Sequence, residues 1–306
     1  MTSDKIELGK QLYFDPRLSK SGAISCNSCH NVMAGGDDNR SLSVGIKGQL
    51  GGRNSPTVWN AAFKSVQFWD GRAATLEEQA KGPIVNPVEM GMDNHAVAIE
   101  RIRNIPGYIA AFKKVFGGND AIHIDNAVKA IAAYERTLIT PNSRFDQYLK
   151  GKKTAITAQE LAGFETFKTT GCVACHNGIN FAGPALPVGT GFYQKFPVTP
   201  DTDIEKKYGF QKDLGRADVT KNAADRNMYA VPTLRNIALT APYFHNGKVS
   251  DLSEAVRIMA KLQLAKDLSQ PDIDKVVAFL KTLNGEFPKQ TMPRLPETAG
   301  TTLINE

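Results

Sequence analysis

The sequence predicts a mainly α-helical fold built from two tandem units of one design. Three observations support this prediction. Apolar residues recur at helical spacing in several segments, a Cys-x-x-Cys-His motif occurs twice, and the residues after each motif match at a fixed offset of 176 positions. With 306 residues, the chain can bury a core in each of two domains, which we place at 1–150 and 151–306.

The first expected helix, at 5–14, has Leu8 and Leu12 one turn apart and ends at Asp15-Pro16. Its counterpart in the second unit starts at the capping box 157–160 and continues with apolar residues at three-residue steps. In both units a loop follows the helix and leads into the Cys-x-x-Cys-His motif.

The remaining expected helices lie at 95–103, 106–116, 125–138, 251–265 and from Pro271 onward. A linker is expected at 151–153. The segment 183–219 contains several Gly and Pro residues and is expected to be irregular. Three prolines after Phe287 predict an extended C-terminal tail.

Cys26, Cys29 and His30 form the attachment signature of a c-type haem. Two thiols at this spacing can form thioethers with the two vinyl groups of one porphyrin, and the His that follows becomes the proximal iron ligand. The alternative is a four-cysteine zinc site, whose two pairs usually lie about 15–20 residues apart.

The second copy of the motif consists of Cys172, Cys175 and His176, and the two copies use all four cysteines of the chain. Because the pairs start at positions 26 and 172 and each is followed by His, the spacing favours two covalent haems over zinc or thiol redox chemistry.

Composition narrows the function classes. The net charge of +6 and the sequence pI of about 9.0 suit either an acidic redox partner or solubility alone. The sequence has no basic run interleaved with aromatic residues, which would indicate nucleic-acid binding. It also has no run of 18 apolar residues, which would indicate a membrane span. The start of the chain has no apolar signal region. Because c-type haem is attached outside the cytoplasm, we expect a periplasmic protein whose export signal is not in this chain.

The fixed offset allows the two haem environments to be compared. Pro56-Thr57 corresponds to Pro232-Thr233, and 68–72 corresponds to 244–248. Met259, on the helix expected at 251–265, lies where a cytochrome c domain supplies its Met ligand. A ligand role is favoured over the alternative of core filling, and it would give this haem a raised potential.

At the matching position of the first unit stands Pro83, which cannot ligate iron and is expected to stop a helix that begins near Thr75. The first haem should therefore lack the Met closure. The loop that follows could bring Glu89 over the open face, where a carboxylate could move a proton for bound peroxide. From the loop alone, a solvated acid is the more common case, and Met90 and Met92 remain rival ligands.

Four other residues are placed less specifically. Trp69 could lie between the haems and assist electron transfer, although a packed core aromatic is as common. Gln79 alone would be taken for a surface helix residue. His123 is expected at a helix end, and His245, which aligns with Trp69, could contact a haem edge or propionate.

These residues resemble the bacterial dihaem cytochrome c peroxidases over nearly the whole chain. Besides the two haem motifs, the specific pieces are RNSPT at 53–57, QFWDGR at 67–72, VEM at 88–90 and VPTLRN at 231–236. The resemblance implies two cytochrome c-like domains, each with one covalent c-type haem, usually in a homodimer with calcium between the haems.

Carried over by position, the resemblance makes the first haem peroxidatic, with His30 proximal and with Gln79 and Glu89 lining the peroxide pocket. The second haem becomes the electron-entry haem, with His176 and Met259 as its ligands.

The resemblance also places Trp69 between the haems and assigns calcium to Asn54, Thr240 and Pro242, the last two through backbone carbonyls. Oxygen donors of this kind suit a hard cation.

One position departs from the family pattern. Many members carry a His after the first haem motif that blocks the peroxidatic iron until the other haem is reduced, and here Ile46 occupies that place. Ile cannot ligate iron, so we expect the first iron to lack this blocking ligand, unless His95 substitutes for it.

The resemblance implies reduction of hydrogen peroxide to water with electrons from a small periplasmic cytochrome c or copper protein (a cupredoxin). Two alternatives stay open. One is a dihaem electron carrier without peroxidase activity. The other is a related dihaem enzyme that matures a tryptophan-derived cofactor, a type that closes its second haem with Tyr, against which Met259 argues.

Overall fold

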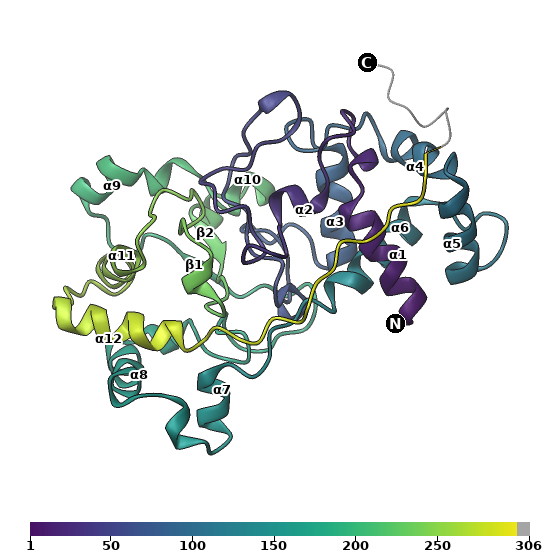
Figure 1. The fold of residues 1–306 in the computed structure, drawn as a ribbon. Coiled ribbons are helices and arrows are strands. Elements are labelled where there is room, and N and C mark those ends of the chain that lie inside the picture. The colour runs from purple at the N-terminus through teal and green to yellow at the C-terminus, as the bar shows by residue number, and fades with distance from the viewer. Residues whose placement is uncertain (299–306) are drawn as a thin grey trace.

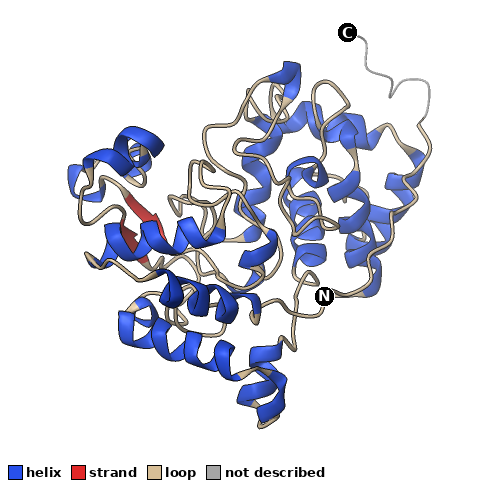
Figure 2. Ribbon diagram, turned by 60° about the vertical axis from the view of Figure 1, so that its left-hand side comes forward, coloured by secondary structure: helices blue, strands red, loops and turns tan. Residues whose placement is uncertain are grey.

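The structure, a computed structural model, describes residues 1–298 and is mainly helical, as predicted (Figures 1 and 2). The only sheet in this part of the chain pairs β1 (Tyr193–Lys195) with β2 (Met228–Ala230) in antiparallel register. The helices are α1 Ser3–Phe14, α2 Cys26–Cys29, α3 Leu76–Val85, α4 His95–Arg103, α5 Pro106–Phe116, α6 Ile124–Glu135, α7 Arg144–Leu149, α8 Ala158–Thr170, α9 Thr202–Tyr208, α10 Ala217–Thr220, α11 Leu252–Leu264 and α12 Gln270–Lys281.

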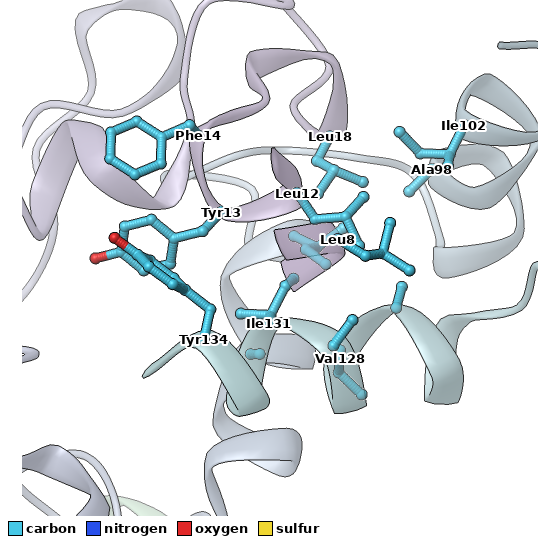
Figure 3. Close-up of a cluster of buried hydrophobic side chains, with 14 of the residues drawn as sticks. Leu8, Leu12, Tyr13, Phe14, Leu18, Ala98, Ile102, Val128, Ile131 and Tyr134 are labelled. Carbon is cyan, nitrogen blue, oxygen red and sulfur yellow. The ribbon is translucent and has the colours of Figure 1, made fainter. Parts of the chain in front are cut away.

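The first core is built on the crossing of α1 and α6 (Figure 3). Leu8 and Leu12 face this core, as their one-turn spacing predicts, and they pack with Ile131 of α6. A side chain at Gly9 would collide with the backbone carbonyl of Ala130, so the close approach of the two helices requires glycine there.

The second core repeats this arrangement with α8 and α12. Gly163 of α8 lies against the backbone of Lys275 in α12, as Gly9 lies against α6. Phe279 is fully buried among Phe145 and Phe167, with ring centroids 5.1 and 5.2 Å away. The chain therefore folds two helix pairs of similar construction, while a domain boundary near 150 stays a prediction.

Local signals placed most helices correctly. The capping box at Thr157 and Glu160 opens α8, Asn94 caps α4, and Pro106 stands at the first turn of α5. The helix expected at 125–138 ends earlier, at Glu135.

Two expectations about loops are wrong in part. The helix α3 does not stop at Pro83 but continues to Val85, because a proline in the last turn removes only one hydrogen bond from a helix about to end. The segment 183–219 is not wholly irregular, since it carries β1, α9 and the start of α10.

The tail after Phe287 has no helix or strand up to residue 298, as its prolines predict, and the rest of it lies outside the described residues. The tail leaves α12 and runs past α1 towards α4 (Figure 1, yellow). The Phe287 ring packs on Trp59 at 4.9 Å, and Gln11 Nε2 donates to Arg294 O at 3.2 Å. The tail therefore connects the second core to the surface of the first.

No helix within residues 1–298 is both long enough and apolar enough to cross a membrane.

Candidate haem sites and peroxide pocket

A cavity of about 620 Å³ in the first unit holds the first haem motif. Cys26 and Cys29 lie on the short helix α2, which Ser25 and Ser28 cap reciprocally. His30 follows at the end of this turn, and its Nδ1 lies 2.9 Å from Pro56 O. This bond assigns the ring proton to Nδ1 and leaves Nε2 as the atom that can ligate a metal.

Gln79 from α3 and Glu89 from the turn after it also line the first cavity. Asn86 Nδ2 donates to Glu89 Oε1 at 2.7 Å, which fixes the carboxylate. Burial raises the pKa of Glu89, and the positive charge of Arg72 opposes that rise. Glu89 is thus a half-buried, oriented acid in the cavity wall and not a solvated loop residue.

The rival ligands for this cavity are placed differently from one another. Met90 lines the cavity, whereas Met92 is buried in the first core and is not part of the lining. His95 Nε2 lies 2.9 Å from Lys81 O, and His95 is also absent from the lining. Ile46 is buried against Gly91, and its N–H donates to Glu89 O at 2.9 Å. Ile46 therefore holds the Glu89 turn in place.

A second cavity of about 220 Å³ contains Cys172, Cys175, His176 and Met259 in its lining. Gly171, in the left-handed conformation, ends α8 and turns the chain into the haem motif. His176 Nδ1 lies 3.1 Å from Phe181 O, so Nε2 is again the free nitrogen. Met259 projects from α11, as its place in the sequence predicts.

The wall between the cavities is shared, and Trp69 lines both of them. Its Nε1 donates to Asn54 O at 2.9 Å, so the indole N–H is satisfied. The Trp69 ring also meets His245 edge-on at 6.3 Å, and His245 lines the second cavity. His123, by contrast, stands at the start of α6, as expected of a helix-end residue.

Asn54, Thr240 and Pro242 all line the second cavity. The Asn54 amide Nδ2 donates to Arg40 O at 2.9 Å, which turns its oxygen, Oδ1, away from that bond. The backbone carbonyls of Thr240 and Pro242 accept no hydrogen bond from residues 1–298. Three residues that carry oxygens of the kind that calcium prefers therefore line one cavity.

Asn86, Lys64 and Glu135 are among the residues of the first cavity that were not predicted. Asn86 could have been found, because Asn three residues before an acid often forms a local turn, and here Val88 N donates to Asn86 Oδ1 at 3.1 Å. Lys64 and Glu135 gave no sequence signal, since their burial depends on contacts far along the chain.

Glu135 offers a stability prediction. Its Oε2 is buried without a hydrogen-bond partner, and burial raises its pKa from 4.5 to about 8. The protonated form therefore stabilises the folded state fully below pH 4.5, and this contribution is lost as the pH rises to 8. Glu135→Gln should raise the melting temperature by several degrees at pH 8 and leave it unchanged near pH 4, measured by circular dichroism of the haem-loaded protein. Equal melting temperatures of the wild-type protein and Glu135→Gln at pH 8 as well as at pH 4 would contradict this account.

A helical chain with two Cys-x-x-Cys-His motifs, each beside a cavity and each with a free histidine nitrogen, is a c-type haem protein. The family model for di-haem cytochrome c peroxidase matches residues 3–154. Cytochrome c551 peroxidase of Nitrosomonas europaea is 50% identical over 96% of this chain and 84% of its own length. The corresponding figures for cytochrome c551 peroxidase of Pseudomonas aeruginosa are 48%, 97% and 83%.

Among solved structures, a MauG-like protein associated with microbial copper homeostasis superposes with a TM-score of 0.81 at 28% identity, covering 94% of this chain and 91% of the other. The chain belongs to the di-haem cytochrome c peroxidase family, and it is an oxidoreductase of the peroxidase class. The family resemblance expected from the sequence is confirmed.

Proposed function

We propose that the chain reduces hydrogen peroxide to water at the first haem, with electrons that enter through the second. The observation that carries this proposal is the asymmetry of the cavities. Glu89, oriented by Asn86, and Gln79 line the first cavity together with the rival sulphur of Met90, whereas the second cavity has Met259. A peroxidatic haem needs an accessible iron face with a proton carrier, and an electron-entry haem needs a closed one.

The chain's residues divide the work of the reaction. Bound haem supplies the iron that takes up peroxide and exchanges electrons. Glu89 accepts a proton from the peroxide oxygen that stays and returns it to the oxygen that leaves. Asn86 keeps the carboxylate aligned, and the Gln79 amide offers a further hydrogen bond to the substrate. Each turnover consumes one peroxide, two protons and two electrons and yields two waters.

Electrons would arrive one at a time from a small cytochrome c or cupredoxin in the periplasm, and Trp69, which lines both cavities, would assist their transfer between the haems. A thioether ligand such as Met259 raises a haem potential, which suits the entry haem to accept these electrons. Asn54 with the carbonyls of Thr240 and Pro242 would bind calcium at the same wall, and the enzyme would work as a homodimer in two cytochrome c-like domains.

Ile46 makes a specific prediction about activation. Ile46 has no atom that can ligate iron, and His95 lies outside the cavity lining with its Nε2 2.9 Å from Lys81 O, so neither residue would close the first iron. The fully oxidised enzyme should therefore turn over peroxide without a lag when donor and peroxide are added together. Stopped-flow turnover of oxidised and pre-reduced enzyme provides the comparison, and a long lag abolished only by pre-reduction would contradict the proposal.

The two other functions make different spectral predictions. A pure electron carrier would show two six-coordinate low-spin haems and no change with peroxide. An enzyme that matures a tryptophan-derived cofactor would have Tyr on its second haem. A high-spin ferric signal that disappears as peroxide is added, with peroxide consumed, supports the peroxidase.

A further inference from the structure

Lys64 occupies an unusual place in the molecule, because it lines both cavities. It follows the short 3-10 turn Ala61–Phe63, and its N–H donates to Ala61 O at 3.0 Å. The backbone is thereby fixed at the wall that also carries Trp69. Among residues 1–298, Lys64 is the one lysine or arginine common to the two linings.

No anionic group of the described chain pairs with this ammonium. Lys64 Nζ makes no hydrogen bond, ion pair or aromatic contact with residues 1–298. The carboxylates of Asp70 and Asp213, which also line the first cavity, are already held by Arg53. Burial alone acts on Lys64, and it lowers the pKa of the ammonium to about 8.

A charge in this position is costly unless a partner accompanies it. The described chain supplies none, but each covalent haem brings two propionate carboxylates, which are the anionic groups of that cofactor. A side chain that lines both haem cavities can therefore meet anions that arrive with the haems. Neutral residues would fill the same wall at lower cost if no such anion were present.

We propose that Lys64 is the shared counter-ion for the propionates of both haems. The inference rests on the proposed binding of two haems, and it adds a role that the peroxidase mechanism does not require. Its consequence is electrostatic. Reduction of each iron adds one negative charge, so a half-buried cation at the wall shared by the two cavities would favour the reduced state of both haems and link their potentials.

The test is potentiometric titration of the dihaem protein, followed optically and without peroxide. Lys64→Gln should shift the reduction equilibrium of both haems about tenfold or more toward the ferric state, equal to about 59 mV for each one-electron couple. Lys64→Arg keeps the charge and should restore both potentials. Lys129→Gln removes the same charge from the exposed surface of α6 and should leave both potentials unchanged, because solvent and salt screen it.

The outcomes separate this inference from the proposed function. Two haems with unmoved potentials in Lys64→Gln would overturn the inference alone, and so would a shift confined to one haem. If Lys64→Gln fails to fold, Lys64→Arg must still match the wild-type potentials, and a tenfold shift there would overturn the inference. Fewer than two haems per wild-type chain, measured as pyridine haemochrome, would contradict the proposed function first.

Discussion

Glu89→Gln should lower peroxidase turnover by about 10²–10⁴-fold, the range that a positioned acid–base group contributes. Glutamine keeps the size of the side chain and can still hydrogen-bond to Asn86, but it cannot accept and return a proton. The optical spectra and potentials of both haems should stay at wild-type values, because Glu89 is neither an attachment residue nor an expected ligand of either haem. Steady-state turnover with a saturating donor measures the effect.

Two further variants make this experiment specific. Asn86→Ala leaves the acid in place but removes the 2.7 Å bond that orients it, so turnover should fall less than in Glu89→Gln. Glu100→Gln changes an exposed acid on α4 and should have no effect. Wild-type turnover in Glu89→Gln would remove Glu89 from the mechanism.

The pH dependence of turnover should follow the same acid. Burial raises the pKa of Glu89, so the deprotonated base needed to accept a proton forms at a higher pH than for a solvated glutamate. The acidic limb of the turnover profile should disappear in Glu89→Gln. This readout separates a chemical role from a merely structural one.

The sequence predicted those features that depend on neighbours along the chain. Helix starts followed from Asn94 and the box at Thr157, because these caps are contacts between residues three positions apart, and from Pro106, whose fixed φ suits the first turn. The haem motifs follow the same logic, since two thiols and a histidine within five residues must reach one porphyrin.

Features that depend on distant contacts could not be predicted from spacing. The Glu89 loop alone suggests a solvated acid, and only its position against Ile46 and Asn86 makes it part of a cavity wall. Lys64 is an ordinary lysine in the sequence, and only the fold shows that it lines both cavities. Resemblance, not periodicity, pointed to Trp69 and Gln79.

Met259→Leu should remove the closure of the second haem while keeping the apolar volume that α11 places there. Because a thioether ligand raises the potential of a haem, its loss should shift the reduction equilibrium of this haem by about 10³-fold toward the ferric state, or about 180 mV. The near-infrared band of methionine-ligated ferric haem should disappear. Turnover with a protein donor should fall, since electrons can no longer enter readily.

Two control variants determine which methionine ligates a haem iron. Met292→Leu alters a methionine that is 67% exposed, and it should leave spectra and potentials unchanged. Met90→Leu tests the rival sulphur in the first cavity: if Met90 ligates the first iron, its removal and not that of Met259 will abolish the methionine band. If the band is lost in Met259→Leu and kept in Met90→Leu, methionine closes the second haem and not the first. The first haem is then left for the substrate, and peroxide reduction depends on this difference between the two haems.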